Sequence, residues 1–136
     1  MITNLQNPLA LLGRIMLSLL FITAGYGKIT HFDGTAGYIA SHGLPMAPVL
    51  TALTICVELG GGLAILLGFC TRYVAIVMAG FTVLTGIFFH NYWALPPDQV
   101  ANMQIHFWKN ISIAGGFLAF AAFGPGAFSV DAKRAQ

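Results

Sequence analysis

Four long apolar segments follow one another along this chain of 136 residues. They lie at residues 8–27, 46–69, 73–92 and 107–123, and the first two have a proline in their first turn. A helix needs about 20 apolar residues to cross the hydrocarbon core of a bilayer. An open sheet is excluded there because its edge groups would lack hydrogen bonds. The sequence therefore predicts an all-α integral membrane protein, with residues 1–136 forming one domain, a bundle of four transmembrane helices.

The composition fits a membrane protein and excludes several other classes. Hydrophobic residues make up 57% of the chain and charged residues only 7%, whereas a soluble domain is about 25% charged. Such a chain could not cover a water-exposed surface with polar groups, and its net charge of +2 is too small for a nucleic-acid binder. We expect the first apolar segment to be a retained helix rather than a signal peptide, because no basic region precedes it and it contains Arg14.

The distribution of basic residues predicts an orientation in the membrane. Four spans put both termini on one side, together with the short turn at residues 70–72. Most of the Lys and Arg residues belong to that side, namely Arg14, Arg72, Lys133 and Arg134. On the opposite side, Lys28 and Lys109 are offset by acidic residues. The positive-inside rule therefore predicts that both termini are cytoplasmic and that the opposite side faces the periplasm.

The connection at residues 29–45 is the longest in the chain and is amphipathic. Its apolar side chains are Phe32, Tyr38, Ile39 and Leu44. We expect this connection to lie at the outer membrane interface. Two interpretations remain open: a lid over the bundle and a plain interfacial turn.

Ionisable residues are few in the predicted spans, and they fall on one face of each helix. A charge at the bilayer centre costs about 3 kcal/mol or more on insertion scales, so each needs a partner or a function. Spacings of three and four residues place them on stripes of polar and small side chains. We expect the four stripes to face one another and to form a polar pocket open to the periplasm. The predicted ligand-binding residues are Lys28, Glu58, His90, His106, Lys109 and Asn110.

Glu58 is the deepest of these residues, near the midplane. At 1.5 Å per residue, Arg14 lies roughly 6 Å to the cytoplasmic side of Glu58 and Lys109 roughly 10 Å to the other side. We predict a structural ion pair between Arg14 and Glu58, with Lys109 as the alternative partner. Such a pair could serve only to fix the register of the helices. The positively charged mouth instead suits an anionic or quinone-like ligand, to whose oxygen atoms His or Lys could donate.

The histidines raise the question of a metal site. His90 and His106 belong to the same outer layer, but a metal ion needs a third or fourth ligand, and Glu58 is too deep to supply it. His31 or His42 could contribute from the long connection. We predict no metal site, and no motif for a built-in redox cofactor is present.

Several motifs stand out: Arg14 with Gly25-x-x-Lys28, the run Glu58-Leu-Gly-Gly-Gly-Leu-Ala, His90 at the end of the third segment, the run that begins Phe107-Trp108-Lys109-Asn110, and the tail from Gly124. Together they resemble the motifs of the DoxX family of small membrane proteins. The Phe107 run and the tail resemble its YphA-like branch most closely. The resemblance implies a four-helical protein of the bacterial inner (plasma) membrane. It also implies site positions at Arg14, Lys28, Glu58, His90, Lys109 and Asn110.

The resemblance further implies a link to redox chemistry, because the family is named after a subunit of a thiosulfate:quinone oxidoreductase. Our leading hypothesis is a redox-linked subunit that binds a quinone or a small oxidised or anionic molecule. If the protein is an enzyme, we expect a quinone-linked oxidoreductase subunit whose electrons come from a partner redox protein or a diffusing quinone. The alternative is a non-enzymatic membrane scaffold or an assembly factor for a partner protein.

Overall fold

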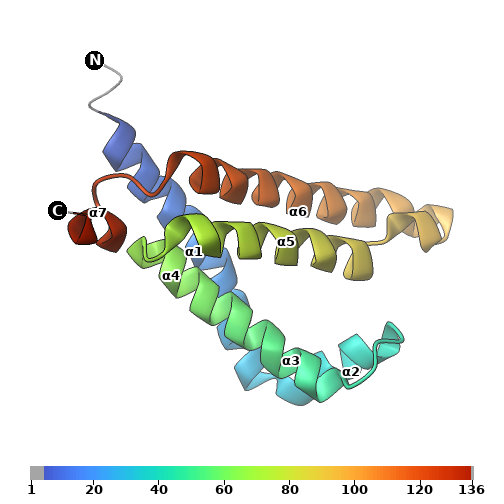
Figure 1. Cartoon of the computed structure of the whole chain (residues 1–136). Coiled ribbons are helices and arrows are strands. Elements are labelled where there is room, and N and C mark those ends of the chain that lie inside the picture. The colour runs from blue at the N-terminus through green and yellow to red at the C-terminus, as the bar shows by residue number, and fades with distance from the viewer. Residues whose placement is uncertain (1–4, 136) are drawn as a thin grey trace.

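The computed structural model describes residues 5–135, and within that range the chain forms helices and connections without a strand (Figure 1). In chain order the elements are α1 (Gln6–Thr30), α2 (Phe32–Ser41), α3 (Ala47–Cys56), the π-helix η2 (Val57–Gly61), α4 (Gly62–Leu67), α5 (Thr71–Phe89), the 3-10 helix η3 (Tyr92–Ala94), α6 (Pro97–Phe123) and α7 (Val130–Arg134). The elements α3, η2 and α4 follow one another without a break and form one continuous rod.

Three segments of the described chain are long and apolar enough to cross a membrane. They are Gln6–Thr30, Ala47–Leu67 and Thr71–Ala94. They coincide with the first three predicted spans, apart from differences of about one turn at their ends. The fourth predicted span, 107–123, is the apolar second part of α6. That it crosses the membrane, and that the termini are cytoplasmic, stay predictions.

The helix α6 begins at Pro97, a full ten residues before the predicted start at residue 107. Pro96 has an extended backbone with a ψ of 151°, and Pro97 occupies the first turn of the helix, where proline needs no hydrogen-bond partner for its nitrogen. The proline pair thus starts the helix directly.

The helices form two pairs that meet at one end of the molecule and diverge toward the other (Figure 1). One pair is α1 with the α3–η2–α4 rod, and the other is α5 with α6. The described chain begins and ends where the pairs meet, and we call this the terminal end; it comprises the α4–α5 turn at residues 68–70 and the segment 124–135. The opposite end, which we call the mouth end, carries α2 and η3.

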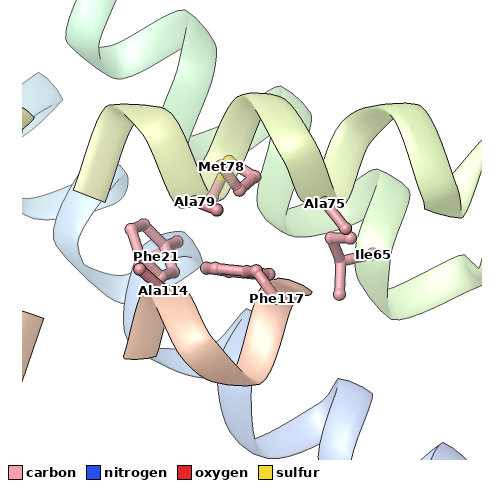
Figure 2. Packing of buried hydrophobic residues seen from close by; sticks show 7 residues of the cluster. All are labelled: Phe21, Ile65, Ala75, Met78, Ala79, Ala114 and Phe117. Carbon is pink, nitrogen blue, oxygen red and sulfur yellow. The ribbon is translucent and has the colours of Figure 1, made fainter. Parts of the chain in front are cut away.

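A small apolar core joins the two pairs (Figure 2). Its buried members are Phe21, Ile65, Ala75, Met78, Ala79, Ala114 and Phe117. The rings of Phe21 on α1 and Phe117 on α6 lie 5.4 Å apart between centroids, and Met78 and Phe117 are fully buried. Because this core is compact and the helices diverge beyond it, space remains between the pairs at the mouth end.

Candidate functional site

A cavity of about 260 Å³ lies between the two helix pairs toward the mouth end. Side chains of α1, α2, the α3–η2 part of the rod, α5 and α6 line it. Five of the six predicted ligand-binding residues are among them: Lys28, Glu58, His90, Lys109 and Asn110. The sixth, His106, lies behind the lining, with its ring stacked on that of His90 at 5.4 Å. The helical spacing in the sequence thus brought together residues that the fold gathers around one space.

The first wall of the cavity carries an ion pair between Lys28 of α1 and Glu58 of η2. The Nζ atom of Lys28 donates to both carboxylate oxygens, at 2.8 and 3.0 Å. The Glu58 side chain is only 8% exposed and that of Lys28 26%. Glu58 lies in a π-helical turn, and single π turns inside helices occur often at functional sites.

A close approach of α1 to η2 makes this pair possible. Gly25 lies one turn before Lys28, and a Cβ atom at Gly25 would come within 2.8 Å of Cγ of Leu59 and 3.2 Å of Cβ of Glu58. Any larger residue would therefore push the two helices apart. The glycine in the Gly25-x-x-Lys28 motif thus has a packing role that directly serves the ion pair.

The predicted ion pair between Arg14 and Glu58 is wrong. Arg14 lies at the terminal end, where it is fully buried and donates to three backbone carbonyls, those of Ile65, Leu66 and Phe128. Glu58 pairs with Lys28 instead, because the long Lys28 side chain reaches the carboxylate from the C-terminal end of α1. Lys109, the alternative partner, instead contacts His106.

The terminal end also contains interactions that the sequence did not reveal. The carboxylate of Asp131 accepts hydrogen bonds from the backbone N–H groups of Cys70 and Thr71, at 2.7 and 2.8 Å, and so caps the start of α5. Partial burial alone would raise the pKa of Asp131, but these hydrogen bonds and the nearby Arg134 hold it below its usual value. At the end of α6, Arg72 donates to the carbonyls of Ala121 and Ala122.

Gly68 allows the terminal end to close. It ends α4 with a φ of +67°, in the left-handed region that favours glycine. A Cβ atom there would lie 2.6 Å from the guanidinium group of Arg14. The carbonyl of Gly68 also accepts a hydrogen bond from the backbone N–H of Asp131 at 2.9 Å. This glycine therefore lets the C-terminal segment pack directly against Arg14.

The second wall of the cavity is formed by α5 and α6 and is rich in nitrogen-bearing side chains. The Nζ atom of Lys109 lies 3.2 Å from Nδ1 of His106. The Nδ1 atom of His90 lies 3.3 Å from the sulfur of Met103. Deeper in the cavity, the amide nitrogen of Asn110 donates to Thr82 and Thr85, both at 3.3 Å, and thereby ties α6 to α5.

The helix α2 closes part of the cavity at the mouth end. Its residues Thr35, Tyr38 and Ile39 line the space, and Ile39 is buried. Tyr38 stacks on Phe89 of α5 at 5.6 Å, and His42 packs edge-on against the same ring at 5.1 Å. The long amphipathic connection is thus largely a helix that reaches from one pair toward the other, an arrangement consistent with a lid.

Sequence reasoning left several lining residues out of the predicted site. They are mostly apolar or hydroxyl-bearing and include Leu20, Phe21, Thr35, Tyr38, Thr54, Phe81, Thr82, Thr85, Phe89 and Ile113. Thr54 and Thr82 share helix faces with Glu58 and His90, so their spacing of four or eight residues was a usable signal. The apolar residues carry no such signal, because lipid-facing residues in the same helices have the same chemistry.

The charges around the cavity do not cancel. Lys28 and Glu58 neutralise each other and form the only salt bridge within residues 5–135. Lys109 has no acidic partner in the part of the chain that the structure describes, so the cavity carries about one excess positive charge. In the same range, no three His, Cys, Asp or Glu side chains gather as they would around a metal ion.

Comparison with known proteins assigns this chain to a family. The sequence model of the DoxX family matches residues 9–91. The inner membrane protein YqjF of Escherichia coli (strain K12) is 46% identical over 128 residues, which cover 94% of this chain and 93% of the relative. The chain belongs to the DoxX family.

Other relatives agree with this assignment. The inner membrane protein YphA of Escherichia coli (strain K12) is 42% identical to this DoxX-family chain over 125 residues, which cover 92% of the chain and 89% of the relative. The Surfeit locus protein 4 homolog of Drosophila melanogaster is 23% identical over 128 residues, which cover 41% of that protein. No solved structure matches the chain significantly. With its apolar helices, the protein is a multi-pass protein of the bacterial inner membrane, embedded in the lipid bilayer.

Proposed function

We propose that this DoxX-family protein is a redox-linked membrane subunit that binds a quinone, or a small oxidised or anionic molecule, in the mouth-end cavity. The observation behind the proposal is the unneutralised Lys109 beside two stacked histidines, facing the Lys28–Glu58 pair across a mostly apolar space. Ligand sites typically combine apolar walls with a few convergent polar groups. A charge without a partner is expensive in a membrane protein, so a ligand supplies a physical reason for its position.

The lining suits a flat molecule that carries carbonyl oxygens. The rings of Tyr38, Phe81 and Phe89 provide an apolar surface, and aromatic rings prefer offset or edge-on contacts with one another. Lys109 and His90 would donate to the oxygen atoms or exchange protons with them. Because the sequence has no motif for an electron carrier, the electrons would come from a partner redox protein or a diffusing quinol.

We also propose that residues 107–123 form a fourth span and that both termini are cytoplasmic, so that the cavity faces the periplasm. Tyr26 near the C-terminal end of α1, Trp93 of η3 and Trp108 of α6 are exposed, as expected for aromatic residues at a membrane interface. A single cysteine at position 41 (Ser41→Cys, in a background without Cys56 and Cys70) tests the orientation. Membrane-impermeant maleimide should label it from the periplasmic side of intact spheroplasts; labelling only after lysis would reverse the orientation.

The binding proposal is tested by the quinone content of the purified protein. Protein extracted in a mild detergent should carry quinone detectable by mass spectrometry, and Lys109→Ala should lose most of it. Lys133→Ala is the matched control, because Lys133 is an exposed lysine of α7 at the terminal end. Repeated absence of quinone from the unmodified protein, with unchanged stability after addition of a short-chain quinone, would favour the alternative of a non-enzymatic scaffold or assembly factor.

A further inference from the structure

Four basic side chains form one cluster at the mouth end. One follows α2, one follows α5 and two belong to α6. We call it the mouth cluster; its members are His42, His90, His106 and Lys109. Resting on the function proposed above, we infer that the mouth cluster binds the oxyanion group of an organic molecule and takes up a proton as it does so. The ligand class is an organic oxyanion with an apolar body.

The contact between Lys109 and His106 determines which atom of the His106 ring accepts a hydrogen bond. An ammonium group can only donate, so Nδ1 of His106, at 3.2 Å, must accept. While this hydrogen bond exists, Nδ1 of His106 carries no proton. A second proton on the ring would end the hydrogen bond and place two positive charges side by side, which is unfavourable without a counter-charge.

The other histidines extend this constraint across the mouth. The His90 ring stacks on His106 at 5.4 Å, and His42 packs on Phe89, the residue next to His90. Every described group facing His90 from α2 and α6 is thus neutral or cationic: His42, His106 and Lys109. Across the cavity, Glu58 is the one carboxylate, and both its oxygens are already bound to Lys28. Asp33 of α2 and Asp98 of α6 form no salt bridge with any of these imidazoles, so no carboxylate of the described residues directly pairs with a protonated ring here.

A bound oxyanion would supply the missing negative charge. It would accept hydrogen bonds from Lys109 and from a protonated imidazole, which are charge-assisted and therefore strong. By linkage, a ligand that favours the protonated form binds more tightly as the pH falls through the range in which histidine titrates, about pH 5 to 8. The same coupling makes the protein take up a proton when the anion binds.

The cavity walls define the rest of the ligand. Leu20, Phe81, Phe89 and Ile113 line the space beside the mouth cluster, and they would exclude a fully hydrated inorganic ion while accepting an apolar body. A free organic acid and the phosphate headgroup of a membrane lipid share this chemistry, because both join an oxyanion to an apolar part.

The test uses the full-length protein in phosphatidylcholine nanodiscs, with benzoate as the soluble organic oxyanion. Calorimetric titration at constant ionic strength should show binding about tenfold tighter at pH 6 than at pH 8. Uptake of one proton on binding changes the affinity about tenfold per pH unit, and we expect this dependence to apply over about one unit of that range. Titration in buffers of different ionisation enthalpy should show proton uptake. A second arm replaces part of the phosphatidylcholine with phosphatidylglycerol; competition with benzoate would identify a lipid headgroup as the occupant, and its absence a free acid.

The variants separate the members of the mouth cluster from an ordinary histidine. His106→Gln should flatten the pH dependence, and Lys109→Gln should weaken binding at both pH values. His31→Gln is the control, because His31 is exposed and its ring hydrogen-bonds to Thr30 and Gly27 outside the mouth cluster; it should behave like the unmodified protein. Affinity that does not change with pH, or no binding of either anion, overturns the inference. If quinone still co-purifies in that case, only this inference is lost and the proposed function stands.

Discussion

The two ends of the molecule use their polar groups in opposite ways. At the terminal end, Arg14, Arg72 and Asp131 all bind backbone groups of other elements. Arg14 ties α1 to α4 and to the C-terminal segment at Phe128, whereas Arg72 ties α5 to α6 and Asp131 caps the start of α5. At the mouth end, Lys28 and Glu58 bind each other, while Lys109 and His90 line the cavity and form no salt bridge within residues 5–135. The difference indicates that the terminal end supplies the stability and leaves the mouth end free to bind a ligand.

The largest loss of stability is expected from Arg14→Met, which removes a buried residue of the terminal end. The substitution removes charge-assisted hydrogen bonds to the carbonyls of Ile65, Leu66 and Phe128. The carbonyl of Ile65 keeps its hydrogen bond from the backbone N–H of Gly68, whereas those of Leu66 and Phe128 lose the donor that Arg14 supplies. Hydrogen bonds to a charged group contribute about 1.5 to 3 kcal/mol each, so we expect a loss of at least about 3 kcal/mol in the free energy of unfolding. Denaturation in mixed micelles measures it. A loss below about 1 kcal/mol would show that the terminal end does not hold the fold.

A smaller loss is expected from Glu58→Leu at the mouth end, because this change leaves Lys28 without its partner. Breaking a buried pair costs about 3 to 5 kcal/mol, but Lys28 is 26% exposed, so we expect about 1 to 3 kcal/mol after allowing for solvent screening. Adding Lys28→Met should recover much of this loss. Adding Arg14→Met instead should not, and the two effects should add within about 0.5 kcal/mol. If Arg14→Met instead rescued the stability of Glu58→Leu, Arg14 and Glu58 would be partners, contrary to the structure.

Asp131→Asn tests how much the Asp131 cap at the terminal end contributes to stability and to its dependence on pH. Because the pKa of folded Asp131 lies below the usual 3.8, its ionised form stabilises the folded protein above that pH. This contribution is lost as the pH falls through the lower folded value. The substitution should lower the free energy of unfolding at pH 7 by about 1 kcal/mol, the usual contribution of a helix cap. It should also reduce the decline of stability below pH 4, measured by thermal unfolding. An unchanged acid profile would show that the cap contributes nothing.

The smallest effect on stability is expected from Tyr38→Leu, which removes the stacking of α2 on Phe89. An aromatic pair contributes about 0.5 to 1.5 kcal/mol, so global unfolding should change by no more than about 1 kcal/mol. Amide hydrogen exchange in α2 should nevertheless become faster, while exchange in α5 and α6 stays the same. Unchanged exchange in α2 would mean that this contact does not hold the helix over the cavity.

The sequence predicts the site better than the contacts within it. Helical spacing placed Glu58 and Lys109 on inward faces because small and polar residues recur every three or four positions. It could not predict that the helix pairs diverge, because that depends on how few side chains fill the core around Phe117. It also missed the partners of Arg14, since backbone carbonyls are present at every residue and leave no mark in the sequence.

The quinone content of Lys109→Ala tests the division between the two ends most directly. Lys109 is exposed and makes its contacts only at the mouth end. The unfolding temperature of the Lys109→Ala protein should therefore match that of the unmodified protein. We predict that the unmodified protein and the control Lys133→Ala co-purify with quinone, and that Lys109→Ala retains little of it at the same stability. Equal quinone content in all three proteins, or quinone in none of them, would contradict the assignment of ligand binding to the mouth end.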